Sequence, residues 1–272
     1  LYLIGLGLGD ERDITVRGLE IVQKADIVYL EYYTSILGVP RETLERFYGC
    51  TVEIADRNLV ENEAEEKLIE PAREQNVVLL VVGDSFGATT HTDLVLRAGH
   101  ANVPVEVVHN ASVMTAIGTV GLELYKFGKT TSIPFWEEGY EPKTPYDVLL
   151  ENKARGAHTL FLLDIKVKEP SKEELRTGIQ TQTPQPRFMT IAQGLEILLR
   201  IEKQSKKGLL TPETFVIGVA RLGQENQKIV AGTINELLSV DFGPPLHSFI
   251  VPGDLQVVEE EAIERWRTKA AD

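Results

Sequence analysis

Short apolar segments alternate with amphipathic segments through the first 110 residues, and this alternation limits the possible folds more than any other feature. Residues 77–82 are apolar without a break, as expected for a strand in a sheet that is covered on both faces. The pattern predicts a parallel sheet with helices on both sides. The expected strands are residues 1–5, 27–32, 51–55, 77–82 and 105–109, and the expected helices are residues 15–24, 40–48, 62–76 and 92–101.

The second half of the chain is less regular. Residues 166–187 are polar and contain several prolines, so we expect a surface excursion there. The sequence therefore predicts an α/β fold of two α/β domains, residues 1–111 with a mostly parallel sheet and residues 112–272 with a mixed sheet. A ligand between two such domains is the default expectation. Strands are expected at residues 130–135, 159–164, 214–220, 228–231 and 248–251, and helices at residues 146–155, 190–204, 233–238 and 255–267.

Composition excludes several classes of partner. The 272 residues carry a net charge of -13, which repels phosphate backbones, so we expect no nucleic-acid partner. Residues 77–82 form the longest strongly apolar run and are too few to span a bilayer. The single cysteine, Cys50, suits a reducing compartment, and with no leader-like segment we expect a cytoplasmic protein. No pair of histidines has the spacing of zinc ligands, so no metal is expected.

A glycine-rich turn over residues 5–10 (Gly-Leu-Gly-Leu-Gly-Asp) follows the first expected strand. A dinucleotide site needs Gly-x-Gly-x-x-Gly, but here Gly9 comes one residue early. Residues 10–13 add three carboxylates, which would repel a pyrophosphate. Glu31, at the end of the second strand, could still bind a ribose, so an NAD-dependent oxidoreductase is one alternative. S-adenosylmethionine carries no phosphate and suits the turn better.

Residues 83–87 (Gly-Asp-Ser-Phe-Gly) match the nucleophile elbow of α/β-hydrolases, with Ser85 as the nucleophile. Asp164 and His247 follow in the chain order that such a triad uses. A serine hydrolase is therefore a second alternative.

The residues after this motif argue against an elbow, which would turn straight into a helix. Thr89 and Thr90 follow instead, and β-branched residues start helices poorly. Thr90 or Thr92 is the expected N-cap of the next helix.

Nine short stretches, in order along residues 1–253, together resemble the diphthine synthases. They are residues 1–9, 13–20, 33–35, 87–91, 109–112, 125–128, 158–160, 163–166 and 245–247. These enzymes belong to the tetrapyrrole-methylase-like methyltransferases. The resemblance implies two α/β domains, a homodimer, and S-adenosylmethionine folded in the cleft between the domains, with S-adenosylhomocysteine as product. It also implies a protein substrate, translation elongation factor 2, in which a 3-amino-3-carboxypropyl group on a histidine is methylated.

The stretch 164–169, with the excursion before residues 186–189, resembles the eukaryotic branch, which also esterifies the carboxylate. The resemblance assigns no catalytic residue; if a base takes part, His91 is the candidate. The family usually has proline where this chain has Ser85, which restores an N–H and frees the loop. The family's cofactor positions fall on Leu8, Asp84, Gly87, Ser112, Val113, Leu163, Leu222 and His247.

Overall fold

The structure is a computed structural model that describes residues 1–167 and 186–267 and divides into two compact units. The first unit is built on Leu1–Ala116 and ends with the short helix α5 (Val113–Ala116), a few residues beyond the predicted boundary at residue 111. The second unit is built on Ile117–Ile165, Arg187–Leu222 and the described residues from 226 to 267.

The first unit contains a parallel five-stranded sheet with strand order β3-β2-β4-β1-β5. All five expected strands are confirmed, with slightly shorter bounds. Because every strand runs in the same direction, all the carboxyl ends lie at one edge of the sheet. The strands are β1 (Tyr2–Gly5), β2 (Ile27–Glu31), β3 (Glu53–Ala55), β4 (Val77–Val81) and β5 (Glu106–Val108).

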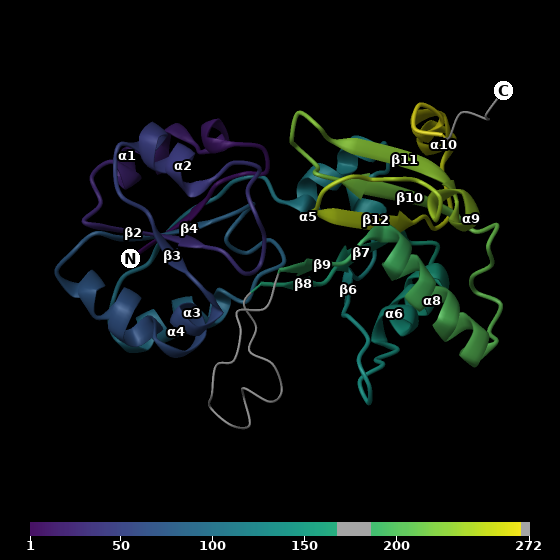
Figure 1. Ribbon diagram of the computed structural model, residues 1–272, viewed down its shortest axis with the longest axis horizontal. Coiled ribbons are helices and arrows are strands. Elements are labelled where there is room, and N and C mark those ends of the chain that lie inside the picture. Colours follow the sequence, from purple (N-terminus) through teal and green to yellow (C-terminus); the bar gives the residue numbers. More distant parts are fainter. Residues whose placement is uncertain (168–185, 268–272) are drawn as a thin grey trace. The chain divides into compact units, whose positions relative to one another are not determined.

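Helices cover both faces of this sheet, as predicted (Figure 1). Helices α1 (Val16–Val22) and α2 (Arg41–Tyr48) pack on the face that carries Leu80, while α3 (Arg57–Asn62) and α4 (Thr92–His100) pack on the face that carries Leu79. Neighbouring residues of a strand point to opposite faces, so the uninterrupted apolar run of β4 fills two cores at once.

Two local predictions in this unit are wrong. The single helix expected at residues 62–76 is broken: α3 ends at Asn62, and a π-helical turn (Glu65–Ile69) and a 3-10 turn (Pro71–Arg73) follow. Pro71 has no N–H to continue a helical ladder, which explains the final break. The apolar spacing of residues 15–24 places Val16 on one helical face with Leu19 and Val22, but Val16 is exposed as the first residue of α1. Another 3-10 turn of this unit is Glu11–Asp13, whereas the 3-10 turns Ile117–Val120 and Leu124–Lys126 belong to the second unit.

The second unit contains a mixed five-stranded sheet, as the sequence predicts, and its strand order is β11-β10-β12-β7-β6. Only β6 and β7 pair in parallel; the other pairs are antiparallel. Its strands are β6 (Thr131–Ile133), β7 (Thr159–Leu163), β10 (Phe215–Ala220), β11 (Lys228–Thr233) and β12 (His247–Val251). A separate pair, β8 (Ile165–Lys166) and β9 (Arg187–Phe188), borders the predicted excursion, of which residues 168–185 lie outside the described part.

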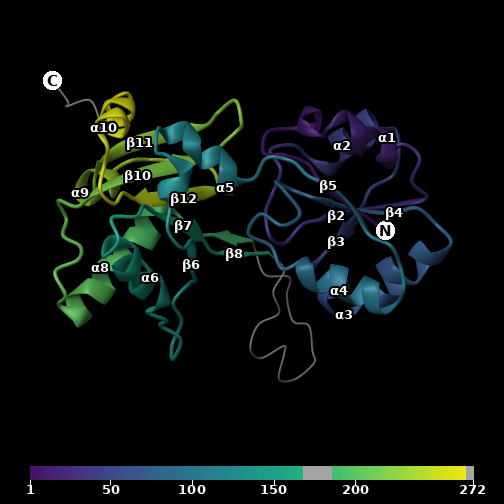
Figure 2. The ribbon, with the colours of Figure 1, turned by 180° about the vertical axis from the view of Figure 1, so that it is seen from behind.

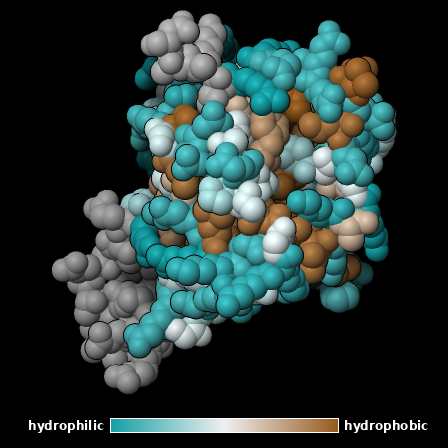
Figure 3. All heavy atoms as spheres, turned by 90° about the vertical axis from the view of Figure 1, so that its right-hand side faces the viewer, coloured by the Kyte–Doolittle hydropathy of each residue, from teal (hydrophilic) through white to brown (hydrophobic). Residues whose placement is uncertain are grey.

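Helices α6 (Thr144–Lys153) and α8 (Ile191–Ser205) cover one face of the second sheet, and α10 (Val257–Glu264) lies on the other (Figure 2). Thr190 and Gln193 form a capping box that fixes where α8 begins. The short α9 (Ile234–Leu237) begins with a similar box at Thr233. On the surface in Figure 3, hydrophobic side chains lie interspersed among hydrophilic ones. Within the described residues, every helix is too short or too polar to cross a membrane.

A buried ionic network ties α10 to this unit. The Glu259 carboxylate is fully buried, 2.9 Å from Nε2 of His158 and 2.5 Å from Nζ of Lys126. His158 accepts a hydrogen bond at Nδ1 from the Gly253 N–H, so Nε2 carries the proton and donates it to Glu259. From the sequence, His158 is interpreted as a surface or capping residue and the acidic run 259–261 as a solvated helix face, but both His158 and Glu259 are buried, so a surface position for either is wrong. Glu259 lies in a run of three glutamates, and nothing in the sequence distinguishes the buried one from its exposed neighbours.

Candidate functional site

The carboxyl ends of β1 and β4 mark the point where the first sheet reverses its direction of growth. From β1 the chain moves to β2 on one side, whereas from β4 it moves to β5 on the other. Ligands of open α/β sheets bind in the crevice outside the strand ends at such a point. The two glycine-containing loops, residues 5–10 and 83–87, both lie there.

Backbone hydrogen bonds join these two loops. The Gly7 N–H donates to the Gly83 carbonyl at 3.1 Å, and the Gly83 N–H donates to the Gly7 carbonyl at 2.7 Å. A Cβ on Gly5 would lie 2.6 Å from the Gly83 oxygen, so a larger residue there would force the loops apart. Gly7 has a φ of 73°, which favours glycine. The early glycines therefore serve a close approach of two loops.

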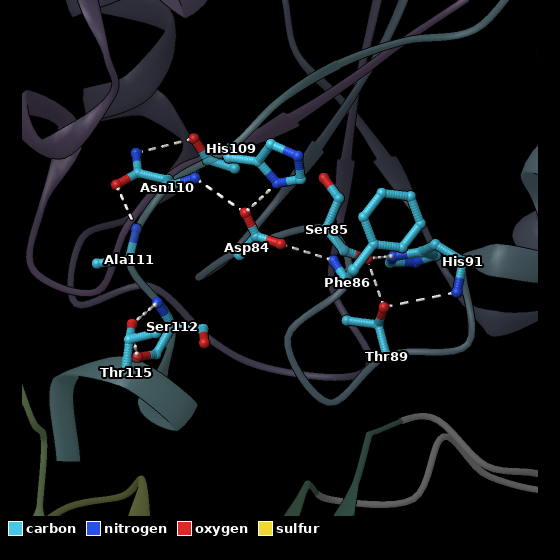
Figure 4. Close-up of polar contacts among 11 residues, drawn as sticks. Asp84, Ser85, Phe86, Thr89, His91, His109, Asn110, Ala111, Ser112 and Thr115 are labelled. Carbon is cyan, nitrogen blue, oxygen red and sulfur yellow. Dashed lines mark hydrogen bonds and ion pairs between the residues drawn. The ribbon is translucent and has the colours of Figure 1, made fainter. Parts of the chain in front are cut away.

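Asp84 connects the β4 loop to the loop after β5 (Figure 4). Its Oδ2 accepts from the Asn110 N–H at 2.9 Å and lies 2.9 Å from Nδ1 of His109, while Oδ1 accepts from the Phe86 N–H at 2.9 Å. Burial alone would raise the pKa of Asp84, but these donors lower it, so the carboxylate is ionised. Asp84 thus organises the loops, whatever else it binds.

Asn110 holds the third loop against the first, a role that sequence reasoning missed. Its Nδ2 donates to the Gly5 carbonyl at 3.0 Å and to the Asp13 carbonyl at 2.9 Å. The Asp13 carboxylate in turn accepts from the Gly9 N–H at 2.8 Å. Asn110 belongs to one of the stretches shared with the diphthine synthases, which was the only signal for it.

Gly87 and Ser112 form the tightest contact between the second and third loops. A Cβ on Gly87 would lie 2.5 Å from Cβ of Ser112 and 2.7 Å from its Oγ. Ser112 is buried, and Val113, half-buried, follows it as the first residue of α5. Leu8 is half-buried in the first loop. The structure therefore brings Asp84, Gly87 and Ser112 together at one edge of the first sheet.

The other predicted positions gather at one edge of the second sheet. Leu163 ends β7, His247 begins β12, and Leu222 follows the end of β10. The pairings Ser248 with Leu162 and Ala220 with His247 place these strand ends side by side.

His247 has a free acceptor. Its Nε2 lies 3.1 Å from the carbonyls of Gly243 and Pro244 and must donate to them, which leaves an acceptor at Nδ1 that is buried and has no partner. Burial lowers the pKa of His247, although these two carbonyls oppose the shift. Arg221, which sequence reasoning also missed, donates to the Phe242 carbonyl at 2.7 Å and so fixes the loop before His247.

The elbow motif does not make a nucleophile. Ser85 is fully buried, and its Oγ has no hydrogen-bond partner. Helix α4 begins only at Thr92 with His91 as N-cap, so the predicted threonine cap is wrong. The Asp164 carboxylate accepts from the Phe135 N–H at 2.8 Å, and Nε2 of His247 faces backbone carbonyls. These contacts give no support to a serine hydrolase.

Glu31 has a local structural role. Its carboxylate accepts from the Thr34 N–H at 3.0 Å and from the Thr34 hydroxyl at 2.8 Å. It is fully buried, and burial raises its pKa to about 7. A carboxylate committed to its own loop is not available for a ribose, which removes the main argument for an NAD-dependent oxidoreductase.

A methylase family model and two curated diphthine methyl ester synthases match this chain. Residues 1–238 match the family model described as Tetrapyrrole (Corrin/Porphyrin) Methylases. The diphthine methyl ester synthase of Dictyostelium discoideum is 51% identical over 271 residues, covering 99% of this chain and 98% of that protein. The diphthine methyl ester synthase of Homo sapiens is 51% identical over 257 residues, which cover 93% of this chain and 90% of that protein.

Solved structures agree with the sequence relatives. One from Entamoeba histolytica is 44% identical and covers 98% of each chain, with a TM-score of 0.87. A diphthine synthase structure is 35% identical and covers 98% of this chain and 95% of the other, with a TM-score of 0.82.

Proposed function

Because the chain belongs to the tetrapyrrole (corrin/porphyrin) methylase family, we propose that it transfers methyl groups from S-adenosylmethionine to translation elongation factor 2 in diphthamide biosynthesis. The acceptor is the 3-amino-3-carboxypropyl group on a histidine of that factor. The end product is the methyl ester, and S-adenosylhomocysteine is released. The enzyme acts in the cytoplasm as a homodimer.

The observation that carries this proposal is the similarity to diphthine methyl ester synthases. About half of the residues are identical, and the similarity extends over almost the whole of both chains. Similarity over a single domain would support a methyltransferase of unknown acceptor. Similarity over both units supports the same acceptor as well, because recognition of a protein acceptor involves more of the chain than binding of the cofactor does.

The chemistry of the proposed cofactor positions is compatible with S-adenosylmethionine. The first-unit edge offers backbone N–H groups, hydroxyls and the ionised Asp84, which suit an adenosine, an amino acid and a sulfonium cation better than a pyrophosphate. We assign Leu8, Asp84, Gly87, Ser112 and Val113 to the cofactor from the first unit. Leu163, Leu222 and His247 are assigned from the second unit, where the unpartnered Nδ1 of His247 is ready to accept a hydrogen bond.

Methyl transfer from a sulfonium needs alignment and exclusion of water more than it needs acid or base at the methyl carbon. The loops around Gly7, Gly83 and Asn110 supply this rigidity, because each is fixed to another by hydrogen bonds to the backbone. A nucleophile held in line with the carbon–sulfur bond would then displace S-adenosylhomocysteine.

A label-transfer experiment tests the function. Purified enzyme is incubated with methyl-labelled S-adenosylmethionine and elongation factor 2 that carries the unmethylated precursor. We expect label on the modified histidine by mass spectrometry, with one methyl group released by mild alkali because it is an ester. Elongation factor 2 with an unmodified histidine is the control and should take up no label. Absence of label from the precursor, with an enzyme that binds S-adenosylhomocysteine, would disprove the acceptor.

A further inference from the structure

A pocket lies entirely within the first unit, between the loop after β2, helix α3 and the start of α4. Its volume is about 240 Å³, enough for a small polar group. Tyr33 lines it from the β2 loop, Glu61 from α3, and Thr90, His91 and Asp93 from the segment that starts α4. These residues do not belong to the set that we assign to the cofactor, although His91 closes the same loop that contains Asp84 and Gly87.

His91, which lines this pocket, has a free acceptor. Its Nδ1 lies 3.0 Å from the Ser85 carbonyl, and a carbonyl can only accept, so Nδ1 carries the hydrogen (Figure 4). Nε2 is then an acceptor with a free lone pair, and it is buried without a partner. The side chain is only 1% exposed. Burial lowers the pKa of His91, so the ring is neutral near pH 7.

Tyr33 adds a second unsatisfied group. Its hydroxyl is buried and makes no hydrogen bond of good geometry, although the Thr90 side chain lies near it. Buried polar atoms without partners are rare, and two of them on one pocket indicate a ligand that completes them. Glu61 and Asp93 also line the pocket, and their exposed carboxylates lie 3.8 Å from Arg57 and 3.4 Å from Arg97. The His91 acceptor and the Tyr33 hydroxyl fit a ligand that donates hydrogen bonds, and Glu61 and Asp93 are carboxylates that could re-pair with an ammonium group.

We propose that this pocket binds the ammonium group of the acceptor, and that His91 Nε2 removes its proton before each methyl transfer to nitrogen. This inference rests on the proposed function. The proton moves from the ammonium to Nε2, and the freed nitrogen lone pair forms the bond to the methyl carbon. The carbon–sulfur bond breaks with its electron pair left on sulfur, which gives S-adenosylhomocysteine. His91 then returns its proton to solvent, and each new N–H ammonium needs the base again.

Ester formation differs from methylation of nitrogen, and the difference allows the role of His91 to be tested separately. A carboxylate is already a nucleophile, and the trimethylated nitrogen has no proton to lose. The proposal therefore requires His91 for methylation of nitrogen and not for methylation of the carboxylate. The charged and titratable groups at the pocket and around Tyr33 are Glu31 at the end of β2, Arg57 and Glu61 on α3, and Asp93 and Arg97 on α4.

The test compares variants on two forms of elongation factor 2, the unmethylated precursor and the trimethylated form. His91→Gln keeps an N–H for the Ser85 carbonyl but is not a base. We expect it to lower kcat/KM for the precursor by about 10²-fold, in the range of general-base catalysis, and to leave ester formation within about 3-fold of wild type. The wild-type profile should lose activity on the precursor as pH falls through the lowered pKa of His91, and His91→Gln should lose that limb.

Tyr33→Phe provides a second variant, because it removes only the hydroxyl. We expect a KM for the precursor about 5-fold higher with kcat nearly unchanged, as for one hydrogen bond. His100→Ala and Tyr32→Phe are matched controls at exposed neighbouring positions and should behave as wild type. Calorimetric binding of S-adenosylhomocysteine checks that each variant is folded.

Two results would overturn the inference. His91→Gln and Tyr33→Phe with wild-type kinetics on the precursor would exclude the pocket while leaving the proposed function intact. Equal losses on the precursor and the trimethylated form would show that His91 only supports the loop. A wild-type enzyme that labels neither form would instead refute the proposed function, and this inference with it.

Discussion

Gly87→Ala is expected to weaken the binding of S-adenosylhomocysteine by about 10²-fold. The new Cβ would lie 2.5 Å from Cβ of Ser112, whereas two carbon atoms need at least about 3.5 Å. The loops after β4 and β5 would therefore separate by about 1 Å, a displacement that can reduce activity by about 10²-fold in an aligned site. Isothermal titration calorimetry measures the affinity directly.

Gly99→Ala is the matched control for this change. Gly99 is exposed in α4, and nothing lies within 4 Å of a Cβ built there. Alanine also favours a helix by up to about 1 kcal/mol over glycine, so this variant should bind as wild type and be at least as stable. If Gly87→Ala bound the ligand as tightly as Gly99→Ala, the contact between Gly87 and Ser112 would not shape the cofactor site.

Glu259→Gln is expected to lower the free energy of unfolding by roughly 3 kcal/mol. Burial alone would raise the pKa of Glu259, but hydrogen bonds from Lys126, the Gln256 and Glu123 backbone and His158 lower it to about 2. A neutral glutamine leaves Lys126 with no buried counter-ion, and breaking a buried pair in this way costs about 3–5 kcal/mol. Urea unfolding followed by circular dichroism measures the loss.

The same carboxylate makes stability depend on pH. Folding lowers the pKa of Glu259 from 4.5 to about 2, so the ionised form stabilises the fold fully above about pH 5. This contribution disappears as pH falls from there through 2, and the gap between wild type and Glu259→Gln should close over that range. Glu261→Gln, on the exposed side of the same helix, is the control and should change stability by less than about 0.5 kcal/mol. A gap that persists at pH 2 would contradict the ionic account.

The elements that the sequence predicted best are those with strong periodicity. The unbroken apolar run of β4 correctly indicated a strand covered on both faces, and the alternation around it predicted the parallel sheet. The helix expected over residues 62–76 is instead the end of α3, a π-helical turn and a 3-10 turn, and Pro71 explains only the last of these breaks. The periodicity of apolar residues indicates which side chains are buried, but it does not show whether the backbone hydrogen bonds of a helix continue.

Individual polar side chains were harder to predict, because their roles depend on partners far away in the chain. Asn110 contacts residues 105 and 97 positions earlier, and Glu259 pairs with His158 across the second unit. No local pattern distinguishes such a residue from a solvated one. Resemblance to a family identified the stretches that contain Asn110, Lys126 and His158, but only the fold explains what these side chains do.

A crystal structure of the chain grown with S-adenosylhomocysteine is the most direct test of the central claim, that the loops after β1, β4 and β5 hold the methyl donor. We predict ligand density against Leu8, Gly87 and Ser112, with Nδ1 of His247 accepting a hydrogen bond from the ligand. Ligand density away from these loops would contradict the account. Density at these loops for a nucleotide that carries phosphate, in place of S-adenosylhomocysteine, would contradict it as well.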